Sequence, residues 1–213
     1  IEYVEPRRGF ESVAGYQPLK DYIVGRVIRP LREPDVAAQY GLTIPRGIVL
    51  LGPPGVGKTY FAKALAKEIG LPMLKLSPTD FLRGIVGESE ARVRQVTDVL
   101  ESMAPNIVFL DELDQLAMPR DSMMSTDSGV TRRMQNGLLD WMGGESRRSF
   151  LVGATNFAQL DKAFVRPGRF DEILVVMPPD KAARLDILRI HTQVLRRVPV
   201  DECLPAFGYL TEK

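Results

Sequence analysis

Residues 47–59 read G-I-V-L-L-G-P-P-G-V-G-K-T, an apolar run followed directly by a glycine-rich pattern. The last eight residues match G-x-x-x-x-G-K-[S/T] in full, and a helical pattern begins at Lys58. Glycines let the backbone turn tightly and point its N–H groups at phosphate oxygens, while the helix N-terminus adds partial positive charge. We therefore predict a nucleotide phosphate site over 52–59, with Lys58 on the β- and γ-phosphates and the Thr59 hydroxyl on Mg²⁺.

The strand that precedes this loop is one of five short apolar runs in the chain. The runs are rich in Val, Ile, Leu and Phe and mostly lack polar alternation, which is typical of strands buried on both faces of a parallel sheet. Amphipathic helical patterns lie over 58–69, 88–103 and 181–195. Strands alternating with helices predict an α/β fold in which helices cover a parallel sheet. The predicted strands are 47–51, 72–76, 106–110, 149–155 and 172–176.

Composition narrows the function classes. The 213 residues are enough for one large domain, or one domain plus part of another. A net charge of +1, from 28 basic and 27 acidic residues, argues against a nucleic-acid protein that works through a broad basic surface. The single cysteine, Cys203, excludes an internal disulfide and favours a reducing, cytoplasmic compartment.

The ends of the chain carry less pattern than its middle. Residues 1–10 are charged and interrupted by Pro and Gly, and we interpret them as a linker. The chain begins with Ile1, so we expect it to be a piece of a longer protein. No apolar run approaches the roughly 18 residues that span a bilayer, and no signal-peptide layout is present in this piece.

An acidic pair follows the apolar run 107–110. Ligands of open α/β sheets bind at the carboxyl ends of strands, so Asp111 is predicted to lie near the phosphates and to hold Mg²⁺. Glu112 can then polarise an attacking water as general base. The alternative is a pair of helix-entry acids without a catalytic task, because acidic residues favour the first turn of a helix. We expect Asp114 to be structural.

Five motifs in this order resemble the AAA subfamily of AAA+ ATPases over about residues 10–195. They are GPPGVGKT, GIVGESEARVRQ (84–95), IVFLDELD (107–114), GATN (153–156) and RPGRFDE (166–172). The resemblance implies a three-layer P-loop NTPase domain over 11–197, with a five-stranded parallel sheet of order 5-1-4-3-2. A helical lid would begin at 198–213. The family hydrolyses ATP to ADP with Mg²⁺, usually as a hexameric ring that remodels or unfolds proteins, although this piece alone can be monomeric.

The resemblance also assigns site residues. Asn156 matches the polar sensor that positions the attacking water; a turn asparagine after a strand is the alternative. His191 matches a histidine placed against the nucleotide; the alternative is a packed core residue. The nucleotide-binding residues that the resemblance implies are Val13, Ala14, Gly52, Pro53, Pro54, Gly55, Val56, Gly57, Lys58, Thr59, Tyr60 and His191.

Two arginines flank a Pro-Gly turn in V-R-P-G-R-F-D (165–171). Arg166 and Arg169 match the family's arginine fingers, which project into the neighbouring subunit's site and stabilise charge on the transferring phosphoryl group. The alternative is a solvated loop in which Arg169 pairs with Asp171. Ile85 and Val86 match the substrate-facing pore loop, where many members that thread polypeptides have an aromatic in place of Ile85.

Other functions stay open at this stage. One is a nucleotide-binding switch or scaffold with little hydrolysis, and another is an activase-like remodeller of one folded enzyme. A third is a motor acting on nucleic acid, which the near-zero charge and the aliphatic pore loop disfavour. We expect the identity of the substrate to be determined by domains outside this core.

Overall fold

One sheet of six strands organises the computed structural model, which describes residues 1–82, 89–117, 128–157 and 159–192. Its order is β1-β3-β4-β5-β2-β6, and the five strands from β2 to β6 are parallel. Numbered along the chain, these five give the order 5-1-4-3-2, which confirms the expected topology. Their bounds are β2 Gly47–Leu51, β3 Met73–Leu76, β4 Ile107–Leu110, β5 Phe150–Thr155 and β6 Glu172–Val175.

The sixth strand, β1 (Glu2–Val4), corrects part of the sequence analysis. It pairs antiparallel with β3, with Tyr3 opposite Leu74, in a segment that we predicted to be a linker. Three residues are too few to show strand alternation in the sequence. The pairing arises because the outer edge of β3 offers backbone N–H and C=O groups that an extended segment can satisfy.

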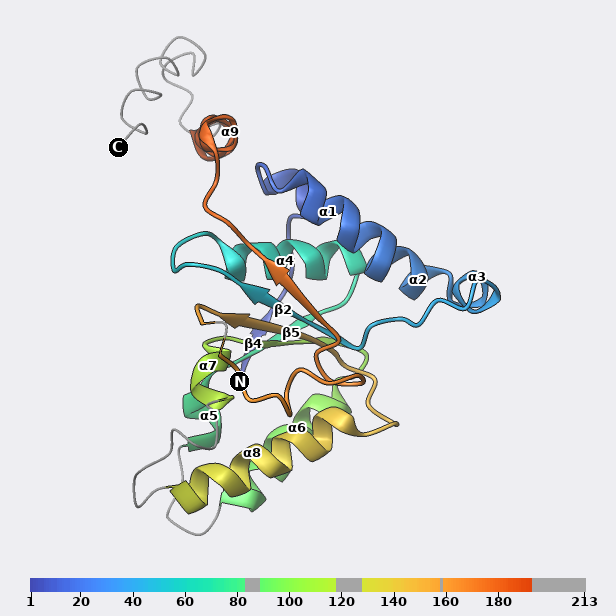
Figure 1. Ribbon diagram of the computed structural model, residues 1–213, viewed down its shortest axis with the longest axis vertical. Helices are drawn as coiled ribbons and strands as arrows, with labels where there is room; N and C mark the ends of the chain where they lie inside the picture. Colours follow the sequence, from blue (N-terminus) through green and yellow to red (C-terminus); the bar gives the residue numbers. More distant parts are fainter. Residues whose placement is uncertain (83–88, 118–127, 158, 193–213) are drawn as a thin grey trace.

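Helices cover both faces of the sheet and make three layers (Figure 1). On one side lie α4 (Lys58–Ile69), α1 (Gln17–Ile23) and α2 (Arg29–Arg32), with a π-helical turn between the last two. On the other lie α6 (Ser89–Ser102) and α8 (Ser128–Gly143) with two short helices. None of the helices in the described ranges is both long and apolar enough to cross a membrane. The remaining helices are α3 (Pro34–Gln39), α5 (Pro78–Leu82), α7 (Leu113–Leu116) and α9 (Lys181–Thr192).

The predicted helices agree with the observed ones. The pattern over 58–69 coincides with α4, the pattern over 88–103 contains α6, and α9 occupies the described part of 181–195. A 3₁₀ turn at Phe10–Ser12 precedes α1. The proposed lid over 198–213 lies outside the described residues, and the domain boundaries stay predictions.

The core is divided by the sheet into two apolar clusters. Successive residues of β2 point to opposite faces, so Ile48 and Leu50 pack with α4 while Val49 packs with α6 and α8. All three side chains are buried, as expected for a strand covered on both faces.

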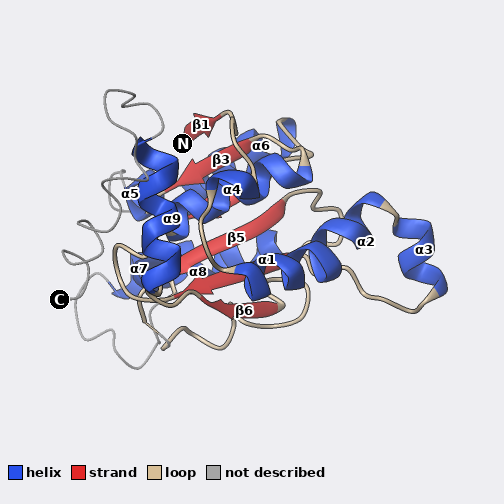
Figure 2. Cartoon of the chain, turned by 90° about the horizontal axis from the view of Figure 1, so that it is seen from above, coloured by secondary structure: helices blue, strands red, loops and turns tan. Residues whose placement is uncertain are grey.

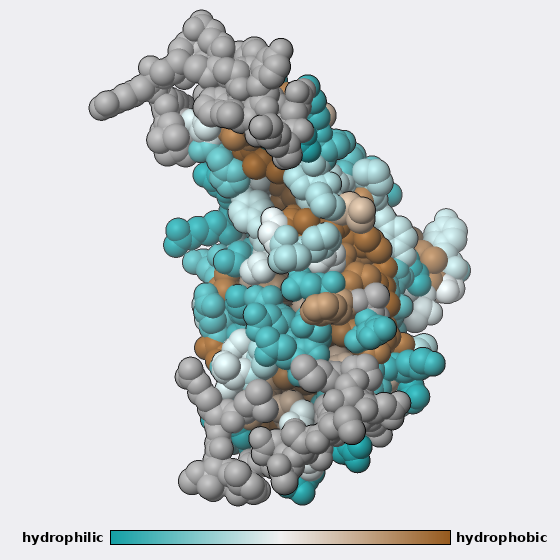
Figure 3. All heavy atoms as spheres, turned by 60° about the vertical axis from the view of Figure 1, so that its left-hand side comes forward, coloured by the Kyte–Doolittle hydropathy of each residue, from teal (hydrophilic) through white to brown (hydrophobic). Residues whose placement is uncertain are grey.

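Strand β6 departs from that expectation. Leu174 is buried, but Ile173 and Val175 are 48% and 55% exposed, so the prediction of burial on both faces is wrong for this strand. The physical reason is its place at the edge of the sheet (Figure 2), where one covered face is enough to hold it. Figure 3 brings the carboxyl ends of the strands forward and shows polar surface in the middle of that side, beside an apolar band.

Candidate nucleotide-binding site

The glycine-rich loop 52–57 connects the carboxyl end of β2 to the first residue of α4. Gly57 has a φ of 91°, a left-handed conformation that glycine adopts without the steric cost of a Cβ, and the helix begins at the next residue. Gly52 lies against β6, since a Cβ there would lie 2.1 Å from the carbonyl oxygen of Val176. Its N–H also donates to the carbonyl of Thr155 at 3.2 Å. The loop is therefore held between the ends of three strands.

Lys58 and Asn156 meet at this edge of the sheet. The Lys58 Nζ donates to the Asn156 Oδ1 at 2.8 Å, and to the carbonyls of Gly52 and Pro53 at 2.7 and 2.8 Å. Burial lowers the pKa of Lys58, while the Asp111 and Asp114 carboxylates oppose that shift. The predicted sensor and the predicted phosphate lysine thus share one polar cluster, although their positions are 98 residues apart.

Asp111 follows β4 and pairs with a residue that the sequence analysis missed. Its Oδ2 lies 2.8 Å from the Nζ of Lys75 on β3, and this hydrogen bond raises the pKa of Lys75 against the effect of burial. The two strands are neighbours, with Lys75 opposite Phe109. A lysine near the middle of an apolar strand is the only sequence signal that points to this contact.

The donors near Asp111 suit a hard divalent cation. The Asp111 carboxylate and the Thr59 hydroxyl are oxygen ligands, which Mg²⁺ prefers. Within the described ranges, no three His, Cys, Asp or Glu side chains cluster closely enough to hold a metal by themselves. The site therefore fits a cation that takes its remaining ligands from water and phosphate, as is usual for Mg²⁺.

Glu112 has an unusual backbone. Its φ is 51°, in the left-handed region, although it is not a glycine. Such a conformation costs of the order of 1–2 kcal/mol for a residue with a Cβ, and strain of this kind gathers at functional sites. The carboxylate is exposed, and its Oε2 accepts a hydrogen bond from Gln115 Nε2 at 2.8 Å. Asp114 has a different partner, since its Oδ1 accepts a hydrogen bond from Thr155 Oγ1 at 3.1 Å.

The residues expected around the adenine lie on two parts of the chain. Val13 and Ala14 are 7% and 8% exposed, and the Val13 carbonyl accepts a hydrogen bond from Lys20 Nζ. The rings of Tyr60 and His191 lie 6.3 Å apart between α4 and α9. Because His191 is exposed, the alternative of a packed core histidine is wrong.

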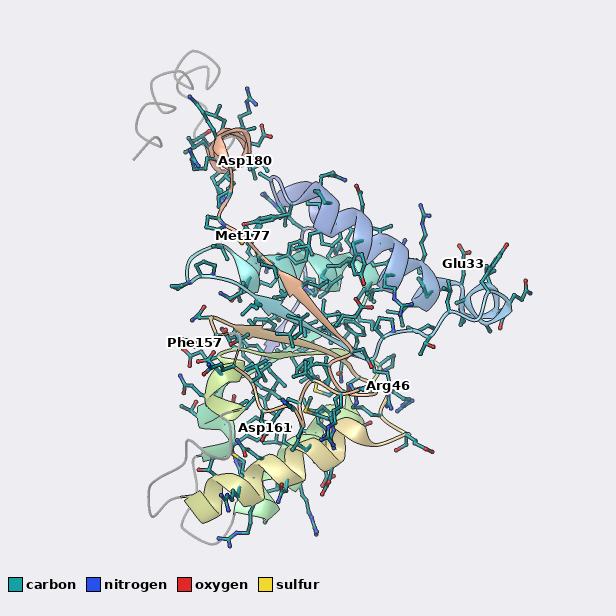
Figure 4. The ribbon with its side chains drawn as sticks, in the orientation of Figure 1. Glu33, Arg46, Phe157, Asp161, Met177 and Asp180 are labelled. Carbon is teal, nitrogen blue, oxygen red and sulfur yellow. The ribbon has the colours of Figure 1, made fainter. Side chains whose placement is uncertain are left out.

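Tyr16 was also missed by the sequence analysis. Its hydroxyl lies 2.9 Å from the carbonyl of Val56 in the glycine-rich loop and 2.9 Å from the carbonyl of Met177, which follows β6. Its ring packs edge-on against Phe61 of α4. Tyr16 thereby connects the loop to the segment that leads into α9, which Figure 4 marks by Met177 and Asp180. No local pattern around Tyr16 indicates this role.

Arg166 and Arg169 lie away from this cluster. Both belong to the loop 165–171, which we call the arginine loop. The N–H of Asp171 donates to the carbonyl of Gly47 at 2.9 Å, so this loop lies at the amino end of β2. The glycine-rich loop follows the carboxyl end of the same strand. At about 3.3 Å per residue, the four steps from Gly47 to Leu51 separate the two ends by roughly 13 Å. In Figure 4, Arg46 and Phe157 label these opposite ends of the sheet.

The two arginines differ in their surroundings. Arg166 is exposed, whereas Arg169 is partly buried and donates from Nη1 to the carbonyl of Ala163 at 2.6 Å. The alternative pair between Arg169 and Asp171 does not form. The Asp171 carboxylate instead accepts from the backbone N–H groups of Arg46 and Gly168 at 2.6 and 2.7 Å. Ile85 and Val86, the pore-loop residues, lie outside the described residues.

Comparison with known proteins agrees with this geometry. Residues 48–177 match the family described as "ATPase family associated with various cellular activities (AAA)". The chain is 41% identical to Protein SAV of Sulfolobus acidocaldarius over 94% of its length, which is 26% of that protein. It is 40% identical to the ATP-dependent zinc metalloprotease FtsH of Acidimicrobium ferrooxidans, over 91% of this chain and 30% of that one.

A third relative is matched over the whole of this chain. It is the proteasome-activating nucleotidase of Methanoculleus marisnigri, 36% identical over 100% of this chain and 52% of its own length. The chain thus spans between about a quarter and a half of the relatives that it matches.

Proposed function

Because this chain belongs to the AAA family of ATPases, we propose that it is the nucleotide-hydrolysing core of a ring-forming motor that remodels or unfolds proteins. One observation carries the proposal. Lys58, Asn156 and the acidic pair Asp111–Glu112 lie at the carboxyl ends of three adjacent parallel strands, β2, β5 and β4. That edge is where ligands of open α/β sheets bind.

The residues divide the chemistry between them. Backbone N–H groups of 52–57 and the start of α4 receive the phosphates, and Lys58 neutralises the β- and γ-phosphate charge. Thr59 and Asp111 would hold Mg²⁺, which when bound neutralises developing phosphate charge. Glu112 takes the proton of the attacking water, and Asn156 orients that water through its amide. The adenine lies between Val13–Ala14 and the Tyr60–His191 pair. The product is ADP with inorganic phosphate.

The position of the arginine loop supports the proposal that the protein forms a ring. Arg166 is exposed on the loop that lies at the amino end of β2, whereas the phosphate loop of its own chain follows the carboxyl end of that strand. It therefore suits a neighbour's nucleotide better than its own. Arginine fingers supplied by a neighbouring molecule are worth roughly 10³–10⁵ in rate for phosphoryl transfer. A closed ring, which we propose to be a hexamer, gives every site such a neighbour.

Protein is the substrate class that we propose. Two of the relatives named above carry names of protein-degrading systems, a metalloprotease and a proteasome-activating nucleotidase. The net charge of +1 gives no support to a broad nucleic-acid surface. The partner itself, the pore contacts of Ile85 and Val86, and a cytoplasmic location stay predictions.

Phosphate release by the full-length protein tests the proposal. The specific rate should rise with protein concentration as the ring assembles. Glu112→Gln should bind ATP with unchanged affinity and hydrolyse it at least about a hundredfold more slowly, as expected for loss of a general base. Tight ATP binding with no turnover in the wild-type protein would instead indicate a nucleotide-dependent switch or scaffold.

A further inference from the structure

A buried arginine lies outside the nucleotide site and has no part in the chemistry described above. Arg147 stands in the connection between α8 and β5 and is 7% exposed. Its guanidinium donates to four backbone carbonyls of the described residues. They are those of Met142 at 3.0 Å, Ser149 at 2.6 Å, Arg46 at 3.3 Å and Gly168 at 3.1 Å. It therefore connects the end of α8, the starts of β2 and β5, and the arginine loop.

The arginine loop, residues 165–171, is buried at its base and exposed at its tip. Phe164 and Phe170 on either side of the turn are 0% and 1% exposed and pack in the cluster under α8. Between them, Gly168 has both of its backbone groups bonded: its N–H to Asp171 Oδ1 at 2.7 Å and its carbonyl to Arg147 Nη2 at 3.1 Å. Arg166 and Pro167 are exposed. The contact with Arg147 is thus two residues from the finger tip.

We propose that Arg147 is a positioning residue that holds the arginine loop in the orientation from which Arg166 reaches the neighbouring subunit's nucleotide. This inference rests on the function proposed above and adds a residue to it. Arg147 touches neither nucleotide nor the reacting atoms. It acts through the carbonyl of Gly168, and therefore on the site of the neighbour rather than on its own.

The surroundings of Arg147 argue for this role over simple packing. Burial, and then the nearby Arg46, lower its pKa to about 10, while Asp171 and Glu101 oppose the shift, so the side chain stays charged at neutral pH. An apolar side chain would fill the same space without the cost of burying a cation. The planar guanidinium offers what an apolar residue cannot, a rigid fork of donors that reaches several carbonyls at once.

Trp141 provides an optical reporter of this arrangement. The Arg147 guanidinium carbon lies 5.9 Å from the centre of the indole ring. Trp141 is the single tryptophan of the chain, and its Nε1 donates to Glu101 Oε1 at 2.8 Å. Because an Arg147 variant removes the nearby guanidinium, the accessibility of Trp141 to a soluble quencher, rather than its emission intensity, shows whether α8 keeps its packing.

Subunit mixing in the full-length protein tests the inference. Arg147→Met should bind fluorescent ATP with wild-type affinity, and its turnover alone should fall at least tenfold, towards that of Arg166→Ala. Mixed in equal amounts with Glu112→Gln, which keeps its fingers, it should regain hydrolysis. In a random mixture about a quarter of the interfaces pair an intact site with an intact finger. Mixed with Arg166→Ala, which lacks the finger, it should regain none.

The control mixture is Arg166→Ala with Glu112→Gln, whose recovered rate is the reference. If this control recovers hydrolysis and the Arg147→Met mixture does not, Arg147 acts within its own subunit and the inference is wrong. If the control mixture recovers no hydrolysis, Arg166 does not act on the neighbouring subunit. The positioning role proposed for Arg147 is then wrong as well. Should Arg147→Met fail to bind ATP or leave Trp141 more accessible to the quencher, Arg147→Lys replaces it. Lysine keeps the charge but lacks the fork, so the same recovery with Glu112→Gln is expected of it.

Discussion

Lys75 and Asp111 lie on the neighbouring strands β3 and β4, and their side chains pair at 2.8 Å at the carboxyl edge of the sheet. The carboxylate expected to bind Mg²⁺ therefore has a cationic partner within its own domain. A divalent cation that approaches Asp111 has to compete with an ammonium group for the same oxygens. We therefore predict that the affinity for Mg²⁺ depends in part on Lys75, which is not one of the proposed ligands.

Removing that partner should strengthen Mg²⁺ binding. A partly exposed pair is worth up to about 1 kcal/mol, so Lys75→Met should lower the Mg²⁺ concentration for half-maximal nucleotide binding by up to roughly fivefold. Titration of Mg²⁺ against fluorescent ATP at fixed concentration measures the shift. Lys67→Met removes the same charge from an exposed position on α4 and serves as the control. Equal curves for both variants would contradict competition at Asp111.

The same pair should make stability depend on alkaline pH. Asp111 raises the pKa of Lys75, so the folded protein holds this proton more tightly than the unfolded chain does. The contribution is complete below the unfolded pKa near 10.4 and is lost as pH rises through the higher folded pKa. The difference in free energy of unfolding between wild type and Lys75→Met should therefore hold up to about pH 10 and shrink at higher pH in urea titrations. A difference that stays constant would show that the variant acts through packing.

Replacing Glu112 with glycine should stabilise the fold and abolish ATP hydrolysis. Its φ of 51° suits glycine, so Glu112→Gly should raise the free energy of unfolding by about 1 kcal/mol through relief of left-handed strain. Hydrolysis should be lost with the carboxylate. Glu112→Gln loses the same chemistry but keeps the Cβ, so its midpoint of denaturation should stay at the wild-type value. A glycine variant that is less stable than the glutamine variant would be inconsistent with strain at this position.

The hydroxyl of Tyr16 should matter for nucleotide affinity. Tyr16→Phe keeps the ring against Phe61 but removes the contacts with the Val56 and Met177 carbonyls. Loss of one net hydrogen bond to the phosphate loop is worth about 1 kcal/mol, or roughly a fivefold rise in the Kd for ATP. Isothermal calorimetry measures it, with Tyr40→Phe as the control because Tyr40 is 77% exposed. An unchanged Kd would mean that the loop keeps its shape without Tyr16.

Substitution of the two arginines of the loop should have different effects on the free energy of unfolding. Arg169 is partly buried and bonded to the Ala163 carbonyl, so Arg169→Ala should lower the free energy of unfolding by about 1–2 kcal/mol. Arg166 is exposed, and Arg166→Ala should unfold within about 0.5 kcal/mol of wild type. Chemical denaturation compares them directly. Equal losses of stability would argue that Arg166 has a structural partner as well.

The parts of the fold that could be predicted are those encoded by local sequence. β2, the glycine-rich loop and α4 follow one another within 47–69, and each step has its own pattern. Asp111 could be predicted to lie at the site because it directly follows an apolar strand of the parallel sheet, whereas the role of Asn156 was implied by the family resemblance. β1 and the open face of β6 could not, because edge pairing and coverage depend on what the rest of the chain leaves free.

Tyr16 and Arg147 were not predicted because their contacts join segments that are far apart in the sequence. Tyr16 contacts Met177 across 161 positions, and Arg147 contacts Arg46 across 101. Both side chains donate to backbone carbonyls. Because every residue has a carbonyl group, the residue type of the acceptor does not indicate such a contact in the sequence. Lys75 was missed because a lysine on a strand is ordinarily read as a solvent-facing position. Side-chain to main-chain contacts of this kind become visible only when the fold brings the two segments together.

Tyr16 has one hydroxyl proton, yet two carbonyl oxygens lie 2.9 Å from its oxygen. Only one of them can accept that proton at a time. Rotation of the hydroxyl about its C–O bond exchanges the two acceptors without moving the ring that packs on Phe61. The glycine-rich loop and the segment leading to α9 are consequently tethered without being locked. If the glycine-rich loop shifts, the hydroxyl can still donate to Met177, and if the segment before α9 shifts, it can still donate to Val56.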